Sequence, residues 1–211
     1  MHASSRPLGE LILEVLEAKP RELIVFLGGT GTVDGGAGLL EVVHELPVPT
    51  RAACDVRSPL LDAAWVFAAQ KGATPEQLPE LERRLLSDVR LEPYRDVPGA
   101  GAAGGLGAAL ASLGAELVEG APLVLDLIRF RERLAGIDLV ITGEGTVDGS
   151  TWMGKAPSAV LEASRPTRCV VFGGIVLDRP ENVEVYELSG DPTRAHEDLV
   201  RLGASASART A

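Results

Sequence analysis

One seven-residue motif, G-x-G-T-V-D-G, occurs twice in the chain, at 29–35 and at 143–149. Each copy follows an apolar run, at 23–27 and at 137–141, and a short apolar run of this kind predicts a buried strand. Both copies are therefore predicted to be loops at the carboxyl ends of strands, where successive backbone amides point outward without a strand partner. Because such loops line the ligand-binding crevice of an open α/β sheet, the motif indicates a fold class and the place of a binding site.

The sixth position of the motif is an aspartate, Asp34 in the first copy and Asp148 in the second. The dinucleotide-binding fingerprint G-x-G-x-x-G has glycine there, so the motif excludes a dinucleotide loop. A carboxylate beside a phosphate is repulsive unless a divalent cation lies between them or the carboxylate accepts a proton from a nucleophile. Two such loops indicate phosphoryl transfer with a metal-bound nucleotide. The alternative is that each aspartate only caps the helix that follows it.

Composition narrows the class of partner. The formal net charge is -10, and no lysine or arginine cluster offsets it, which argues against nucleic acid and anionic membranes as partners. The cysteines Cys54 and Cys169 both lie in apolar segments, which predicts buried free thiols and a reducing cytoplasm. The charged residues among the first twenty positions are not typical of a signal peptide, and the histidines lack the spacing of a zinc site.

Strand-like runs alternate with helical periodicity along the chain. This alternation predicts an α/β fold with a mostly parallel sheet and helices on both faces, in three layers. We expect one such domain over 1–203, with a small helical lobe around 50–135 as an option, and a flexible tail of small residues at 204–211. The predicted strands are 22–27, 51–56, 137–141, 169–172 and 183–188, and the predicted helices include 36–46, 60–69, 122–134, 156–163 and 193–202.

A glycine-rich segment at 99–107 opens an apolar helix of small residues, and it includes Gly104 and Gly105. Such an opening is typical of an anion site at a helix N-terminus. It is equally typical of a place where backbones pack closely, so both interpretations stay open.

Five stretches, in this order, resemble the bacterial glycerate kinases of galactarate and glyoxylate metabolism, which phosphorylate D-glycerate with ATP. They are GGTGTVDGGAG at 28–38, CDVRSPL at 54–60, QKGA at 70–73, GAAGGLG at 101–107, and ITGEG through GKAP at 141–157. The resemblance extends from about Leu8 to Leu202. It implies a phosphotransferase that uses ATP and Mg²⁺ to convert D-glycerate, or a similar small hydroxy acid, into 2-phosphoglycerate.

The resemblance and the chemistry of the side chains together give a set of candidate site residues. The catalytic candidates are Asp34, Asp148 and Lys155, and the candidate Mg²⁺ ligands are Asp34, Asp148 and Glu144. Which aspartate is the base and which binds the metal is left open. The candidates for substrate or nucleotide binding are Gly29, Thr30, Thr32, Asp55, Lys71, Gly104, Gly105, Gly143, Glu144 and Gly145. The expected partners are a hydroxy acid and a nucleotide, and a homodimer is one open assembly.

Several candidates have a plainer alternative. Asp55 could bond only to turn amides. Lys155 could be an ordinary surface lysine, and Lys71 could be attracted only by the C-terminus of its helix.

The chain also departs from the family pattern. It has TGTV at 30–33 where the family usually has Ser-Ala-Thr-Asn, and Thr146 and Ser150 where the family usually has Arg and Gln. No stretch corresponds to the family's N-terminal segment, which carries Asp-Ser-Phe-Lys-Gly and Asp-Gly-Gly-Glu-Gly motifs. The alternative function is therefore a catalytically degenerate member that binds a nucleotide, a metabolite or a protein partner.

Overall fold

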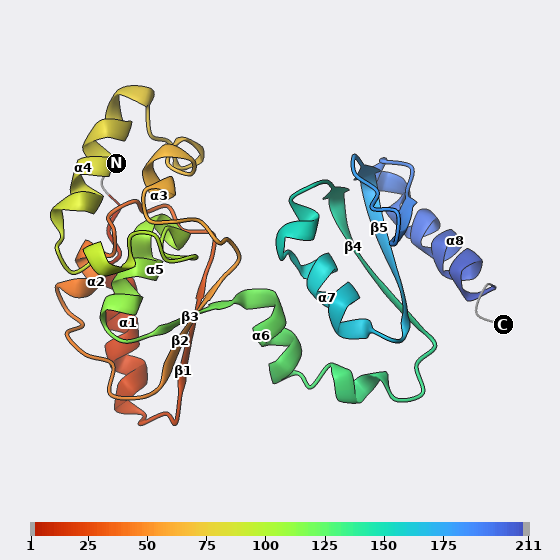
Figure 1. Ribbon diagram of the computed structural model, residues 1–211, viewed down its shortest axis with the longest axis horizontal. Coiled ribbons are helices and arrows are strands. Elements are labelled where there is room, and N and C mark those ends of the chain that lie inside the picture. Colours follow the sequence, from red (N-terminus) through yellow and green to blue (C-terminus); the bar gives the residue numbers. More distant parts are fainter. Residues whose placement is uncertain (1–2, 209–211) are drawn as a thin grey trace. The chain divides into compact units, whose positions relative to one another are not determined.

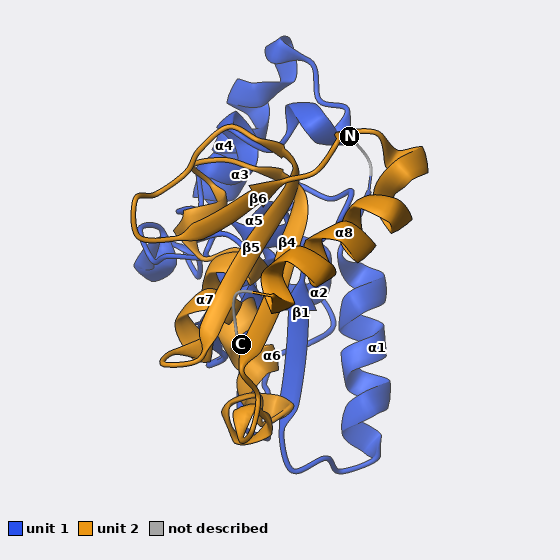
Figure 2. Ribbon diagram, turned by 90° about the vertical axis from the view of Figure 1, so that its right-hand side faces the viewer, with its two compact units in different colours: residues 1–120 blue, residues 121–211 orange. Residues whose placement is uncertain are grey.

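The structure is a computed structural model that describes residues 3–208 (Figure 1). The chain divides into two compact units, residues 1–120 and residues 121–211, called here the N-terminal and C-terminal units (Figure 2). Each unit has a three-stranded sheet in which all strand pairs are parallel. The α/β class and the parallel pairing are confirmed. The sequence suggested one domain over 1–203 with a lobe around 50–135, whereas the boundary between the two units lies at Gly120.

The N-terminal unit contains the sheet β1-β2-β3. Its strands are β1 (Leu23–Leu27), β2 (Thr50–Cys54) and β3 (Glu116–Glu119). Its helices are α1 (Arg6–Glu17), α2 (Ala37–Leu40), α3 (Asp62–Trp65), α4 (Leu78–Ser87) and α5 (Ala102–Ser112), with the 3₁₀ turns η1 (Ala69–Lys71), η2 (Pro75–Gln77) and η3 (Glu92–Tyr94). The sequence did not predict β3, because a strand of four residues carries little periodic signal.

The core of this unit lies between its sheet and α5, which contacts all three strands. Alternate residues of β1 are buried, as expected for period-two side chains, whereas Phe26 on the opposite face is 56% exposed. Helix α2 ends at Leu40, although the sequence predicted a helix to residue 46. Two β-branched residues, Val42 and Val43, follow it, and such residues have low helix propensity.

The C-terminal unit contains the sheet β4-β5-β6, with α7 on one side and α8 on the other (Figure 1). Its strands are β4 (Leu139–Val147), β5 (Arg168–Val176) and β6 (Glu184–Glu187). Its helices are α6 (Gly120–Leu127), which begins at the unit boundary, α7 (Ala156–Ser164) and α8 (Ala195–Ser207), with the 3₁₀ turns η4 (Arg131–Leu134), η5 (Thr151–Met153) and η6 (Pro192–Arg194).

The predicted flexible tail at 204–211 begins inside α8, which continues to Ser207. The helix extends this far because Leu202 and Ala206 are buried, and burial of an apolar stripe is what stabilises most helices in proteins. Residues 209–211 lie outside the described residues. Within residues 3–208, no helix combines the length and the apolar character that crossing a membrane requires.

The two copies of the motif have different conformations. The first copy is a loop, as predicted, because β1 ends at Leu27 and its partner β2 ends at Cys54. The prediction of a loop was wrong for 143–147, which belong to β4. Strand β5 continues to Val176 and pairs with this segment, with Gly143 opposite Phe172 and Val147 opposite Val176. A strand partner is therefore present in the second case and not in the first.

Candidate functional site

A cavity of about 380 Å³ lies in the N-terminal unit, at the carboxyl ends of β1 and β2. It is the position at which open α/β sheets bind ligands. Four segments line it: the loop after β1, the loop after β2, the segment that leads into and includes η1, and the start of α5. The lining residues are Leu27, Gly28, Gly29, Thr30, Asp55, Val56, Phe67, Gln70, Lys71, Gly101, Ala102, Ala103 and Gly104.

Lys71 places an ammonium group at this cavity. Its Nζ donates to the Thr30 hydroxyl at 3.2 Å and to the Thr32 carbonyl at 2.9 Å. Partial burial lowers the pKa of Lys71, and the nearby Asp34 opposes that change. Both hydrogen-bond partners are neutral, and within residues 3–208 no ion pair involves Lys71. The cation is therefore fixed in position while its charge stays available to an anion.

Asp55 places a carboxylate at the same cavity. The alternative in which Asp55 bonds only to turn amides does not occur, since no described residue donates a hydrogen bond to this carboxylate or forms an ion pair with it. Asp55 and Lys71 are also not paired with each other. The cavity thus offers a free acceptor and a separate cation to whatever enters it.

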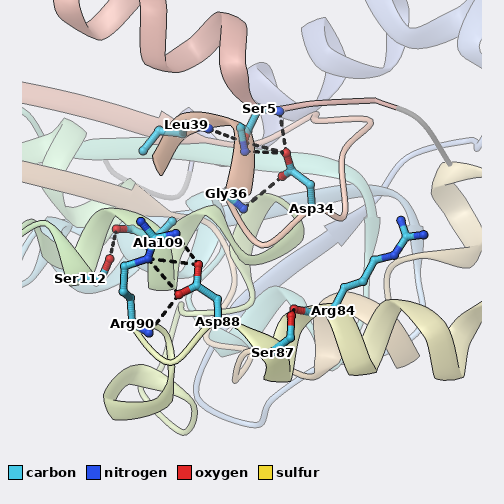
Figure 3. A network of polar contacts seen from close by, with 11 residues as sticks. Ser5, Asp34, Gly36, Leu39, Arg84, Ser87, Asp88, Arg90, Ala109 and Ser112 are labelled. Atoms are coloured by element: carbon cyan, nitrogen blue, oxygen red, sulfur yellow. Dashed lines mark hydrogen bonds and ion pairs between the residues drawn. The ribbon is translucent and has the colours of Figure 1, made fainter. Parts of the chain in front are cut away.

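Asp34 lies in a different environment, a network of backbone and hydroxyl donors (Figure 3). Its Oδ2 accepts from both the amide and the hydroxyl of Ser5 at 2.8 Å, and its Oδ1 accepts from the Gly36 amide at 3.1 Å. The Gly38 amide donates to Oδ2 at 3.4 Å, and the Ser5 hydroxyl accepts from the Leu39 amide at 3.0 Å. Asp34 therefore joins the start of α1 to the start of α2. This is the capping arrangement that the sequence had left open.

Asp34 also does not line the cavity that holds Asp55 and Lys71. It lines a second cavity of about 310 Å³, together with Arg84 and Asp88 of the α4 region. Asp88 is in turn engaged by Arg90, whose Nη2 lies 2.6 Å from Asp88 Oδ2 (Figure 3). Asp34 thus lines a different cavity from Asp55 and Lys71.

The glycine-rich opening of α5 packs against the first motif loop. Ala103, Gly104 and Gly105 all have positive φ, at 52°, 76° and 95°. A Cβ atom on Gly104 would lie 2.0 Å from the Thr32 carbonyl oxygen, so only glycine fits there. Close packing is therefore confirmed as one role of this segment. Its first residues also line the cavity, so the segment shapes the site as well.

The C-terminal unit carries a separate charged cluster at the end of β4. The hydroxyl of Thr151 donates to Glu144 Oε1 at 2.5 Å and accepts from the Asp148 amide at 2.9 Å. Thr151 is fully buried, so it fixes the position of Glu144. Lys155 Nζ lies 3.7 Å from Glu144 Oε2 and 4.0 Å from Asp148 Oδ1.

Asp148 keeps part of its carboxylate in solvent, since its side chain is 39% exposed. Its Oδ1 accepts from the Ser150 hydroxyl at 2.5 Å and from the Ser150 amide at 2.8 Å. These donors, first the hydroxyl and then the amide, lower the pKa of Asp148, with a smaller contribution from Lys155. Asp148 is therefore an anion at neutral pH, and its Oδ2 accepts no hydrogen bond from the described residues.

The donor set of this cluster fits a magnesium ion bound together with a nucleotide. Within residues 3–208 no three acidic, histidine or cysteine side chains converge on one point. Mg²⁺ commonly takes only one or two carboxylates from the protein and completes its octahedron with waters and substrate phosphates. Glu144 and Asp148 supply such a pair, and both lie beside Lys155.

The predicted residues thus fall into two groups, one in each unit. Five of them line the cavity of the N-terminal unit: Gly29, Thr30, Asp55, Lys71 and Gly104. Thr32, Asp34 and Gly105 lie outside its lining, and Gly143, Glu144, Gly145, Asp148 and Lys155 belong to the C-terminal unit. Sequence reasoning missed Thr151 and Ser5, whose hydroxyl groups engage Glu144 and Asp34. The only signal for Thr151 was a hydroxyl residue three positions after Asp148, which is a common turn pattern.

The chain is similar to proteins of one known family. The family model described as "Glycerate kinase family" matches residues 1–44 and 41–190. A glycerate kinase of Bacillus cereus is 36% identical over 92% of this chain and 64% of its own length. The glycerate 2-kinase of Escherichia coli K12 is 34% identical over 81% of this chain and 56% of its own length. The chain therefore spans about three fifths of the curated relatives that it matches.

A solved structure gives the same result. The crystal structure of a protein described as a glycerate kinase 2 from Salmonella typhimurium LT2 matches with a TM-score of 0.68 and 31% identity. The match covers 88% of this chain and 61% of that one.

Proposed function

The chain belongs to the glycerate kinase family, and on that basis we propose that it takes part in the ATP-dependent phosphorylation of D-glycerate or a similar small hydroxy acid. The product by family resemblance is 2-phosphoglycerate. The two free, buried cysteines support a cytoplasmic location. The chain is proposed to act on small molecules.

The observation that carries this proposal is that Lys71 and Asp55 line the same cavity without forming an ion pair with each other. A hydroxy acid has a carboxylate, which needs a cation, and a hydroxyl group, which needs an acceptor. Lys71 supplies a cation with only neutral partners, and Asp55 supplies a carboxylate without a partner among the described residues. The two groups are not neutralised by each other, so each can bind its own part of the substrate.

We assign the base to Asp55 rather than to Asp34. Asp34 accepts four hydrogen bonds from Ser5, Gly36 and Gly38, and it lines a different cavity from Lys71, whereas Asp55 lines the same cavity as Lys71. In the proposed reaction the substrate hydroxyl loses its proton to Asp55 as its oxygen bonds to the γ-phosphorus of ATP. The bond from that phosphorus to the bridging oxygen breaks, and ADP leaves with the electron pair.

The cluster in the C-terminal unit is proposed to hold the nucleotide's phosphates. Glu144 and Asp148 would hold Mg²⁺, and Lys155 would pair with a phosphate oxygen as a point charge. When bound, Mg²⁺ neutralises charge on the phosphates. Thr151 keeps Glu144 oriented, and the donors of Ser150 lower the pKa of Asp148.

A degenerate member that binds a nucleotide without transferring phosphate is the second candidate function. One observation favours it. Ser150, where the family usually has Gln, donates both its amide and its hydroxyl to Asp148 Oδ1, so this oxygen is less available to a metal ion.

The test is ADP release from Mg-ATP with and without D-glycerate, in the 211-residue chain. Lys71→Met should raise KM for glycerate by about tenfold to a hundredfold, the loss expected for one charge-assisted hydrogen bond. Asp55→Asn should lower kcat by about a hundredfold or more with little change in KM. Lys19→Met, at the end of α1, is the matched control and should match the unsubstituted chain.

If Asp55→Asn retains full kcat, the assignment of the base is wrong. If the unsubstituted chain releases no ADP with glycerate but is stabilised against heat by Mg-ATP, the degenerate function holds instead.

A further inference from the structure

An apolar cavity of about 320 Å³ lies in the C-terminal unit, beside the charged cluster but distinct from it. It is formed at the carboxyl ends of β4 and β5, by the segment after β6, and by η6 and α8. Its walls are mainly the apolar side chains of Phe172, Ile175, Leu188 and Leu199. Its size lies within the range of cavities that hold small ligands, about 300–1,000 Å³. Of its lining residues, only Glu144 has a role in the proposed reaction.

Two of its apolar side chains are exposed to solvent. Ile175 is 48% exposed and Leu199, on α8, is 41% exposed. At about 25 cal/mol per Å² of apolar surface removed from water, a flat apolar ligand placed between them would gain binding energy. The aromatic ring of Phe172 adds a surface on which another ring can stack.

Charge decides which part of a ligand can enter. Glu144, Asp191 and Asp198 line the cavity, and no described lysine or arginine does. Phosphate groups are therefore excluded from it. A neutral ring that carries an amino donor is favoured, because the Asp191 carboxylate keeps one oxygen, Oδ2, to which no described residue donates.

Glu144 connects this cavity to the charged cluster. Glu144 is one of the residues that line the cavity, while its carboxylate lies 3.7 Å from Lys155 Nζ and accepts from the Thr151 hydroxyl. The unit therefore presents an apolar cavity and a cation-bearing site next to each other. A molecule with a flat apolar end and an anionic end fits this arrangement, and a nucleotide is such a molecule.

We propose that this cavity binds the adenine base of the nucleotide, with its phosphates at Glu144, Asp148 and Lys155. The proposal rests on the proposed function, because only an enzyme that uses a nucleotide needs a base site. It assigns base recognition to Phe172, Ile175, Leu188 and Leu199.

Adenosine, which lacks phosphates, is the direct probe. Binding of adenosine to the full chain is measured by calorimetry, and binding of Mg-tripolyphosphate is measured as the probe for the phosphate site. Leu199→Glu should weaken adenosine binding by about tenfold or more and leave tripolyphosphate binding within about twofold. Val200→Glu, the next residue on α8, is 60% exposed and does not line the cavity, so it should change neither.

A second variant tests the same cavity from the strand side. Gly145 lines it, and a Cβ atom there would have no heavy atom within 4 Å, so Gly145→Val should fold and should also weaken adenosine binding. The proposal is overturned if the unsubstituted chain does not bind adenosine, if both cavity variants bind it normally, or if Val200→Glu weakens binding as much as they do.

Turnover separates this proposal from the proposed function. Glycerate-dependent ADP release with an unchanged KM for ATP in Leu199→Glu would refute the base site and leave the kinase function intact. Adenosine binding that Leu199→Glu abolishes, in a chain that never phosphorylates glycerate, would refute the kinase function and keep the base site.

Discussion

Replacing Asp34 by alanine is expected to destabilise the N-terminal unit, whereas the same change at Asp148 should not. The two residues occupy the same position of the repeated motif, but their partners differ. Asp34 accepts from the buried residue Ser5, which is 3% exposed, and from the Gly36 amide. Asp148 accepts from its near neighbour Ser150 and is partly in solvent.

The size of the stability loss follows from the hydrogen-bond donors that would lose their acceptor. Without the Asp34 carboxylate, the amide and hydroxyl of Ser5 lose an acceptor at 2.8 Å, and each unsatisfied buried donor costs about 1–3 kcal/mol. Some of this cost is recovered as water or other groups approach. We therefore expect Asp34→Ala to lower the free energy of unfolding by about 3 kcal/mol, which is about two powers of ten in the unfolding equilibrium. The melting temperature should fall by on the order of 10 °C.

Urea denaturation followed by tryptophan fluorescence is a suitable assay, because each unit contains one tryptophan. Trp65 lies in the N-terminal unit and Trp152 in the C-terminal unit. In a Trp152→Phe background the signal comes from Trp65 alone and reports on the unit that contains Asp34. In a Trp65→Phe background it comes from Trp152 alone and reports on the unit that contains Asp148. If Asp34→Ala unfolds at the urea concentration of the parent, or if Asp148→Ala loses as much stability, the different roles assigned to the two aspartates are wrong.

Three further outcomes are expected. Gly104→Ala should destabilise the N-terminal unit by about 3 kcal/mol or more, because Gly104 has a positive φ and the added Cβ would overlap a backbone carbonyl. Gly145→Ala should be tolerated, because its Cβ would meet no heavy atom, and thermal melts compare the two variants. The donors of Ser189 hold the pKa of Asp198 below its ordinary value of 3.8, so this carboxylate stabilises the fold above that pH and the contribution is lost as pH falls through the lowered pKa. Urea titrations between pH 2 and pH 5, roughly the range in which an aspartate titrates, should then show a flatter acid limb for Asp198→Asn. Burial raises the pKa of Cys54 to about 11, so the thiol should not react with iodoacetamide in the folded chain. At pH 8, roughly half a unit below the pKa of a free thiol, mass spectrometry should show alkylation of Cys54 only when the chain unfolds.

The sequence predicted the fold class correctly, and the reason is local. Apolar runs such as 23–27 read as strands whatever surrounds them, and their alternation with helical segments implies parallel pairing. The five stretches that resemble the glycerate kinases identified the family for the same reason, because a motif is recognised from the order of its residues alone. The division of the strands into two sheets was not predictable in this way, because strand pairing joins residues that are far apart in the chain.

The repeated motif shows which features the local sequence does not determine. The sequence determined that two G-x-G-T-V-D-G segments follow two strands and that each carries an aspartate. Only the tertiary structure decided that Asp34 meets Ser5, 29 residues earlier, while Asp148 stays beside Lys155. It also decided that the second copy lies in β4, because β5 is long enough to pair with it. A carboxylate's chemistry depends on the donors and charges that reach it: those of Asp34 include the donors of Ser5, far away in the chain, and those of Asp148 come from Ser150 and Lys155, a few residues away.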